Sequence, residues 1–318
     1  MVKKIAALFQ VDPLSNLNFK SDSSIFLIHE AIEQGIDIWV CSPNNISFCN
    51  NCVSVKAQRV LSLSLTLSEP LRISIKDFDF FFIRQEPPFD MHYLTNCYIL
   101  ELHKHFNKKP FFINEPSAIK NFTEKLSPLF FSELMPKTYI TSDLEEFERM
   151  LISMKVVVIK KLFNKGGDGV FKIKKGDKNA SEIFKKCSSN LKESIVVQEF
   201  IKEVKYGDKR VILIEGKPKG VINRIPKKGN FKANLHLGAK ANKSHLTSKE
   251  KRICKILEPM LIKSGLFFVG IDIINEKLTE INVTCPTGLV QIKQLEEKNL
   301  ATHIWKRLIK IKNSILLQ

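Results

Sequence analysis

Three polar side chains, Asp272, Glu280 and Asn282, interrupt two apolar segments, "VGIDII" and "KLTEINV", whose composition is typical of paired strands. If residues 275–277 form a three-residue turn, Asp272 stands opposite Glu280 and the isoleucines share the other face. A two-residue turn would mix polar and apolar side chains on both faces. The apolar pattern therefore favours the three-residue turn and predicts one polar face that holds Asp272, Glu280 and Asn282.

Carboxylate and amide oxygens are hard ligands that suit Mg²⁺ or Mn²⁺, and Mg²⁺ usually completes its coordination with water and substrate phosphates. The polar face therefore predicts a divalent metal site that serves a phosphate-containing substrate. The alternative is a solvated sheet face without any ligand. Three neighbouring segments favour the metal site.

The first of these segments, "IKKLFNKGGDGVF", carries a glycine loop. Lys160 ends a predicted buried strand, and Gly166, Gly167 and Gly169 would let backbone N–H groups approach an anion closely. The segment lacks the Walker pattern. Glycines at a hairpin tip also need no function, so the loop alone decides little.

The second segment places Arg210 and Arg224 on facing strands of a hairpin that turns at Glu215-Gly216. Two arginines among Val and Ile are notable in a chain with only 8, although surface salt bridges are the alternative. The third segment, residues 225–240, has the length and the Gly, Lys and Asn content of a mobile lid. Simple surface disorder would have the same composition.

The net charge raises nucleic-acid binding as another function. The formal charge is +17, in a chain that is 44% hydrophobic and 26% charged. Its basic residues are 42 Lys and 8 Arg spread along the chain, whereas bidentate phosphate and base recognition favours clustered Arg. We therefore expect no nucleic-acid partner, and a surface that attracts anionic substrates.

Other features favour a cytoplasmic protein without membrane association. No apolar run reaches the roughly 18 residues that span a bilayer, and Asp12 and Pro13 interrupt any signal-peptide core. The 7 cysteines are scattered, which is typical of reduced thiols. Cys49 and Cys52 flank a predicted hairpin tip, and residues 103–105 ("HKH") are expected on the polar face of a helix, so neither predicts a metal site.

The predicted elements divide the chain into an α/β part and an α+β part. Residues 1–122 open with a strand, a helix and a strand, and a buried strand ending in Arg84 follows. Residues 123–318 show strands with Gly-rich turns, with a helix over about 247–264 and another over 301–317.

Taken together, these segments resemble an ATP-grasp ligase, and more closely the bacterial glutathione synthetase family. The similarity extends along nearly the whole chain and includes "VDPLSNLNFKSDSS", "RQEPPFD", "INEPSAI", "TEKLSPLFFSELMPKTYIT", "GDKRVILIEGKPK", "FVGIDII" and "LTEINVTCPTG". The resemblance implies an N-terminal α/β pre-ATP-grasp domain over 1–122. It implies a two-lobed ATP-grasp domain with antiparallel sheets over 123–318, divided into a central lobe (123–203) and a C-terminal lobe (204–318). It also implies a homo-oligomer, a tetramer.

The resemblance assigns roles to individual residues. Contacts to ATP are implied for Lys125, Lys160, Gly166, Gly167, Gln198, Glu199, Phe200, Ile201 and Asp208. Metal ligation, with Mg²⁺ or Mn²⁺, is implied for Asp272, Glu280 and Asn282. Catalytic charges around the transferring phosphate are implied for Arg210 and Arg224. Substrate contacts are implied for Arg84, Lys232, Thr284, Cys285, Pro286 and Thr287.

The implied reaction joins γ-glutamylcysteine to glycine with ATP, giving glutathione, ADP and phosphate. A carboxylate is a poor acyl donor because its leaving group would be oxide, so the cysteinyl carboxylate is first phosphorylated. The glycine amine then displaces phosphate, while metal and arginines neutralise the developing charge and the lid excludes water. No side-chain nucleophile is required. Cys285, where serine is more usual, is expected to be a small filler.

The chain departs from the family pattern at three places. Phe163 and Asn164 stand where Asp-Gly is usual, Lys232 stands for a lid arginine, and residues 289–291 (Leu-Val-Gln) replace Ile-Arg-Glu. These departures bear on turnover and on acceptor recognition. Two rival predictions are an ATP-grasp ligase that joins other amino acids, such as glutamate or D-alanine, and a decayed relative without activity.

Overall fold

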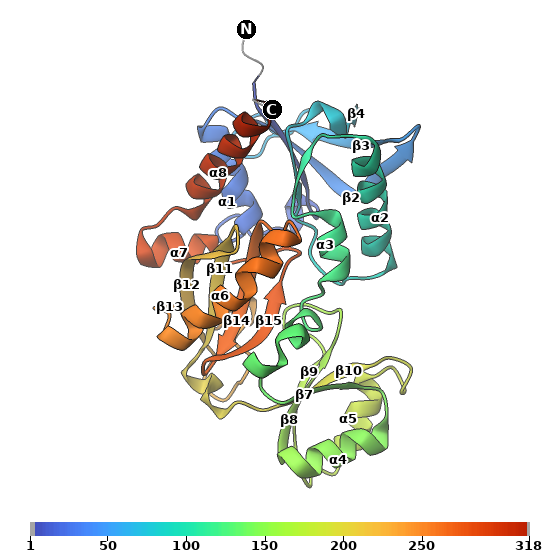
Figure 1. Cartoon of the computed structure of the whole chain (residues 1–318), viewed down its shortest axis with the longest axis vertical. Helices are drawn as coiled ribbons and strands as arrows, with labels where there is room; N and C mark the ends of the chain where they lie inside the picture. Colours follow the sequence, from blue (N-terminus) through green and yellow to red (C-terminus); the bar gives the residue numbers. More distant parts are fainter. Residues whose placement is uncertain (1–3, 317–318) are drawn as a thin grey trace.

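The computed structural model describes residues 4–316, which form three β-sheets with helices packed around them (Figure 1). The N-terminal sheet has the strand order β4-β3-β2-β1-β5-β6. Strands β1, β2, β5 and β6 run parallel. Strand β3 pairs antiparallel with β2, and β4 pairs antiparallel with β3. The strands are β1 (Ala6–Gln10), β2 (Asp37–Cys49), β3 (Cys52–Arg59), β4 (Leu71–Ser74), β5 (Phe80–Ile83) and β6 (Phe111–Ile113).

Three helices accompany this sheet: α1 (Ser23–Glu33), α2 (Met91–Phe106) and α3 (Pro116–Asn121). Asp22 caps helix α1, because its side chain accepts hydrogen bonds from the backbone N–H groups of Ser24 and Ile25. Its buried face packs on the sheet through Ile25 and Ile28. The cap matters for the site, because it fixes the start of α1 at the edge of the cleft described below.

One prediction in this domain is wrong. His103 was expected on the polar face of α2, but its side chain is fully buried. The backbone N–H of Val53 donates to its Nδ1 (3.0 Å), and Nε2 lies 2.8 Å from the carbonyl oxygen of Lys109. Because Nδ1 accepts a hydrogen bond, the ring is neutral. Burial lowers the pKa of His103.

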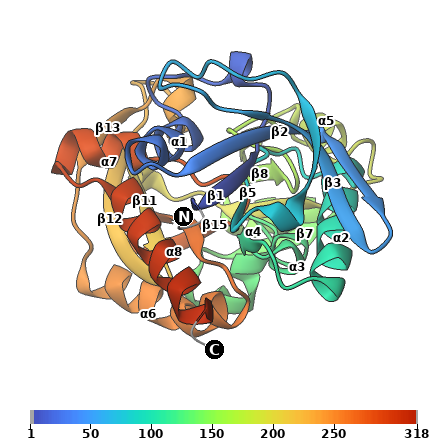
Figure 2. The ribbon, with the colours of Figure 1, turned by 90° about the horizontal axis from the view of Figure 1, so that it is seen from above.

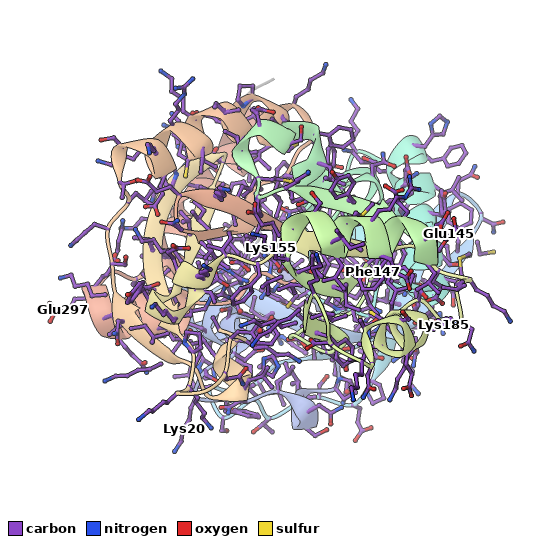
Figure 3. All side chains as sticks on the ribbon, turned by 90° about the horizontal axis from the view of Figure 1, so that it is seen from below. Lys20, Glu145, Phe147, Lys155, Lys185 and Glu297 are labelled. Atoms are coloured by element: carbon purple, nitrogen blue, oxygen red, sulfur yellow. The ribbon has the colours of Figure 1, made fainter. Side chains whose placement is uncertain are left out.

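The central lobe is a four-stranded antiparallel sheet with the order β7-β10-β8-β9. It is covered by α4 and α5, whose Phe147 and Phe184 rings stack with centroids 4.3 Å apart. Figure 3 looks at this lobe from below, with Phe147 on α4 and Lys185 on α5. The elements are β7 (Thr138–Thr141), α4 (Leu144–Met154), β8 (Val156–Lys161), β9 (Val170–Lys174), α5 (Ala180–Cys187) and β10 (Ile195–Glu199).

The C-terminal lobe is a five-stranded antiparallel sheet with the order β13-β12-β11-β14-β15. Helix α6 (Ser248–Lys263) confirms the helix predicted over about 247–264. It packs on this sheet and begins with a capping box between Thr247 and Glu250. The strands are β11 (Asp208–Ile214), β12 (Lys217–Ile225), β13 (Lys240–Lys243), β14 (Phe268–Ile274) and β15 (Lys277–Asn282). Short 3-10 helices are η1 (Leu14–Asn16), η2 (Ile75–Asp77), η3 (Ser127–Leu134), η4 (Lys202–Tyr206) and η5 (Leu235–Leu237).

The pairing of β14 with β15 confirms the predicted register but not the predicted turn. Asp272 stands opposite Glu280. However, Ile274 pairs with Lys277, so the turn has two residues, Asn275 and Glu276. Both turn residues have positive φ (48° and 59°), which such a tight hairpin requires.

A bulge in β15 explains how a two-residue turn gives the longer register. Ile273 pairs with Leu278 while Asp272 pairs with Glu280, so Thr279 is an extra residue. The Thr279 hydroxyl lies 3.1 Å from the carbonyl oxygen of Asp272, to which it donates. The bulge therefore keeps the isoleucines in the core and the polar side chains on the other face.

The last two helices, α7 (Leu289–Glu296) and α8 (Leu300–Leu316), return the chain to the N-terminal sheet. Trp305 of α8 is fully buried and lies against the rings of Phe9, Phe80 and Phe82. Figure 2 shows α8 beside α1. The segment predicted within the C-terminal lobe thus also packs against the N-terminal domain. Within residues 4–316, no helix has both the length and the apolar content to cross a bilayer.

Candidate active site

A cleft of about 1380 Å³ is bordered by the four-stranded and five-stranded sheets and by loops of the N-terminal domain. Nearly all of the predicted site residues line it. They are Lys125, Lys160, Gly166, Gly167, Gln198, Glu199, Phe200, Ile201, Asp208, Arg210, Arg224, Lys232, Asp272, Glu280, Asn282, Cys285 and Thr287. The remaining three, Arg84, Thr284 and Pro286, do not line it.

Buried ion pairs form the centre of the cleft. Arg210 donates to Asp272 through Nε (2.5 Å) and Nη2 (2.9 Å), and Nη2 of Arg224 lies 3.1 Å from the same carboxylate. Arg224 also pairs with Asp208 at 2.6 Å. Strands β11, β12 and β14 are adjacent, so their side chains converge without any long loop.

The electrostatics differ between the two aspartates. Burial alone would raise the pKa of Asp272, but Arg210 and Arg224 outweigh it and hold that pKa below its usual value. Burial raises the pKa of Asp208 to about 7, because Arg224 offsets only part of the desolvation. Burial and the two arginines therefore act differently on the two carboxylates: the pKa of Asp272 is lowered and that of Asp208 is raised.

Glu280 and Asn282 face the cleft from β15. Glu280 Oε1 lies 3.4 Å from Lys160 Nζ, and Asn282 Nδ2 donates to Asp272 Oδ2 at 3.4 Å. Neither contact is short. No cluster of three His, Cys, Asp or Glu side chains suited to a metal occurs among the described residues. A metal here would therefore depend on a carboxylate, an amide oxygen and ligands from outside the chain.

The glycine loop lies between β8 and β9 and is held from two sides. Gly166, Gly167 and Gly169 all have positive φ, and a side chain at Gly166 would collide with the His236 ring. Lys232, in the segment predicted as a lid, donates from Nζ to the Gly167 carbonyl (2.7 Å). The segment thus contacts the loop. It contains the short helix η5 and ends at Lys240, the first residue of strand β13.

Residues 198–201 form the other wall of the cleft, at the end of β10. Gln198 is buried and donates to the Thr138 hydroxyl (2.8 Å). Lys172 Nζ lies over the Phe200 ring, 3.9 Å from its centroid. The rings of Phe200 and Phe231 are nearly perpendicular, with centroids 6.1 Å apart. Phe200 and Ile201 give this wall apolar surface, while Gln198 and Glu199 add polar groups, a combination that suits an aromatic base.

The turn after β15 is fixed from behind by Arg84. This arginine is 2% exposed, and it donates to the Ser24 hydroxyl (2.9 Å) and the Pro286 carbonyl (3.0 Å). Ser23 accepts hydrogen bonds from the N–H groups of Gly288 and Leu289. Arg84 therefore shapes this wall without lining the cleft.

Cys285 does line the cleft, but its chemistry does not favour nucleophilic attack. Burial raises the pKa of its thiol to about 12. The thiol is therefore protonated at neutral pH, in agreement with its predicted role as a filler.

Glu124 is a cleft residue that the sequence analysis missed. It accepts a hydrogen bond from the Thr284 hydroxyl (3.3 Å), and its Oε2 lies 3.6 Å from Lys125 Nζ. Burial raises its pKa. Its position beside Lys125 was the available signal. The N-terminal loops contribute further lining residues: Asn16, Leu17, Asn18, Ser21, Asp22, Glu86, Pro87 and Pro88.

The fold matches solved ligases over nearly the whole chain. D-cycloserine synthetase DcsG superposes with a TM-score of 0.66 at 14% identity, covering 95% of this chain and 99% of its own. The ATP-grasp ligase PsnB, solved with its minimal precursor, gives a TM-score of 0.61 at 13% identity, with 96% and 99% coverage. The three-sheet fold with its central cleft is therefore an ATP-grasp fold.

Sequence comparisons narrow this class. Residues 5–120 match the N-terminal domain of prokaryotic glutathione synthetase, and residues 124–297 match its ATP-grasp domain. The glutathione synthetase of Brucella melitensis biotype 1 is 34% identical over 96% of this chain and 98% of its own length. The glutathione synthetase of Prochlorococcus marinus subsp. pastoris is 37% identical over 96% of this chain and 99% of its own length. The chain belongs to the prokaryotic glutathione synthetase family, whose members are ATP-dependent ligases.

Proposed function

We propose that this chain joins glycine to the cysteinyl carboxylate of γ-glutamylcysteine through an acyl phosphate, at the expense of ATP. The observation that carries the proposal is the meeting of Arg210, Arg224, Glu280 and Asn282 with the glycine loop in one cleft. Such a set can bind a triphosphate and neutralise charge on a transferring phosphate. Membership of the family supports the choice of substrates.

In this proposal the nucleotide lies between the two antiparallel sheets. The wall of Gln198, Glu199, Phe200 and Ile201 takes the adenine, and Lys125 and Lys160 take the phosphates beside the N–H groups of Gly166 and Gly167. Asp208 lies within reach of the nucleotide, since it lines the same cleft. The aromatic wall and the cations match the two ends of ATP in polarity.

The donor set fits a divalent cation. Glu280 and Asn282 would hold it, because the contacts of Glu280 to Lys160 and of the Asn282 amide to Asp272 are both long, 3.4 Å. Asp272 is less suited as a ligand, since both of its oxygens already accept hydrogen bonds from Arg210 or Arg224. When bound, Mg²⁺ or Mn²⁺ would draw charge from the phosphates of ATP.

The reaction moves one phosphoryl group and then releases it. A carboxylate oxygen of γ-glutamylcysteine takes the terminal phosphoryl group, and the bond to ADP breaks. The glycine ammonium group gives up one proton to water, and its nitrogen bonds to the carbonyl carbon. Phosphate then leaves, and the nitrogen gives up a second proton, so that the amide formed keeps one N–H. Arg210 and Arg224 are placed to neutralise the phosphoryl oxygens, Cys285 and Thr287 to contact the acceptor side, and Lys232 to keep the lid on the glycine loop.

Isotope transfer tests the acyl phosphate. With ¹⁸O in the cysteinyl carboxylate of γ-glutamylcysteine, the proposal predicts one ¹⁸O in each phosphate released. Unlabelled phosphate would show that ATP is hydrolysed by water without activation of the carboxylate. We further propose a cytoplasmic homo-oligomer, a tetramer by resemblance, without nucleic acid. Sedimentation equilibrium of the purified protein tests the assembly.

A further inference from the structure

Phe163 stands at the start of the glycine loop, and its side chain is 44% exposed. It does not belong to the core of the central lobe, where Phe147 and Phe184 are fully buried. Packing within its own lobe therefore does not account for this large apolar residue.

Its partner lies in the N-terminal domain. The backbone N–H of Phe89 donates to the Phe163 carbonyl oxygen (3.0 Å), and the two ring centroids are 6.4 Å apart. The ring centroid of Phe89 in turn lies 4.8 Å from that of Tyr93, a fully buried residue of α2. The contact thus connects the glycine loop to the core of another domain.

A second connection joins the same two segments. Lys165, two residues further along the loop, forms an ion pair with Glu86. Lys125 Nζ donates to the carbonyl oxygens of Asn164 (2.7 Å) and Leu162 (3.4 Å), on either side of Phe163. The beginning of the loop is therefore held by residues 86–89 and by Lys125.

We propose that Phe163 is a positioning residue whose contact with Phe89 anchors the glycine loop over the cleft before ATP binds. The proposal rests on the proposed function, because the loop is taken to hold the phosphates of ATP. Glu86, Pro87 and Pro88 line the cleft themselves, so the anchor joins the nucleotide side to the N-terminal side. Without it the loop populates conformations that do not bind ATP, and the apparent affinity falls by the same fraction.

Kinetics of Phe163→Ala test the anchor. Aromatic contacts are worth about 0.5–1.5 kcal/mol, so we expect KM for ATP to rise roughly two- to thirteenfold, with kcat within about twofold of the parent. Phe163→Leu keeps an apolar contact, so its KM for ATP should stay near that of the parent. Phe130→Ala is the matched control, because Phe130 is 73% exposed and does not line the cleft.

A double-mutant cycle shows whether the two rings act as a pair. If they do, Phe89→Ala together with Phe163→Ala should raise KM for ATP no further than the single changes do. Fully additive effects of the two changes would contradict the pairing.

Two readouts do not depend on ligation. Affinity for a non-hydrolysable ATP analogue should fall in Phe163→Ala, and trypsin should cleave faster after Lys161 or Lys165. If the parent makes no glutathione while these shifts persist, the proposed function fails and the anchor stands. Parent-like analogue affinity and cleavage in Phe163→Ala overturn the anchor. A lower melting temperature with unchanged ATP affinity also overturns it, because the role would then be structural.

Discussion

Arg210 and Asp272 stand directly opposite each other on strands β11 and β14, and two hydrogen bonds of 2.5 and 2.9 Å join their side chains. Both side chains are more than nine-tenths buried. A buried pair of this kind is costly to desolvate, and its geometry compensates only while both partners are present. The pair therefore makes the centre of the cleft rigid and sensitive to single substitutions.

Asp272→Asn should destabilise the fold and not only reduce activity. It leaves the guanidinium groups of Arg210 and Arg224 buried with less compensating charge, which typically costs about 3–5 kcal/mol. Arg210→Lys keeps the charge but loses the two-pronged contact, so its loss of stability should be smaller. Urea unfolding of both variants measures the difference; equal stability of Asp272→Asn and the parent would contradict the account.

Glu280→Gln removes a charge with almost no change in volume. The fold should survive, while a weakened hold on the metal ion removes electrostatic stabilisation of the transferring phosphate, which costs about 3–4 kcal/mol, or about 10²- to 10³-fold in rate. Asn282→Ala should be milder, since water can replace a neutral ligand. Glu133→Gln, at an exposed residue outside the cleft, is the control. Turnover against Mg²⁺ concentration is the measurement, and full activity in Glu280→Gln would refute the metal site.

Lys232, in the segment that we propose as a lid, donates one hydrogen bond to the Gly167 carbonyl. Lys232→Ala should lower turnover or increase ATP hydrolysis without ligation, because the lid excludes water from the acyl phosphate. Lys232→Arg should preserve or raise turnover, since its planar fork can make more contacts. The ratio of ADP to glutathione is the readout. Parent-like ratios and rates in both variants would mean that Lys232 does not act in closure.

His103 should make stability depend on pH. Its pKa is lowered in the fold from 6.5, so the unfolded chain binds more protons as the pH falls below that value. The contribution of neutral His103 to the free energy of unfolding is therefore complete above about pH 6.5. It is lost on acidification, by at most about 1.4 kcal/mol per pH unit. Urea unfolding between pH 7 and 5 measures how stability changes with pH. His103→Gln should reduce this dependence, whereas His105→Gln, at an exposed position, should leave it unchanged. An unchanged slope in His103→Gln would assign the effect to other groups.

Local patterns predicted the elements well where hydrophobic period and caps agree. Helix α6 over 248–263 and the hairpin turn at Glu215-Gly216 follow from such signals. The β14–β15 register was predicted correctly although the turn was not, because the core fixes which faces the side chains take. A bulge such as the one at Thr279 leaves no mark in the hydrophobic pattern.

Tertiary contacts account for what the sequence did not predict. His103 is buried because α2 packs against β3 and because its ring contacts the carbonyl oxygen of Lys109. The hydrophobic pattern of the helix predicts neither contact. Arg84 donates a hydrogen bond to the carbonyl oxygen of Pro286, which lies 202 residues further along the chain. Glu124 enters the cleft next to Lys125, and this neighbour was its only signal, because a single carboxylate has no repeat or spacing pattern of its own.

The most direct test of the account is ADP release by the purified protein with Mg²⁺ and ATP, measured with each substrate alone and with both together. The account predicts rapid ADP release, matched by an equal amount of glutathione, only when γ-glutamylcysteine and glycine are both present. Release of ADP with D-alanine or glutamate pairs, and none with γ-glutamylcysteine and glycine, would contradict it.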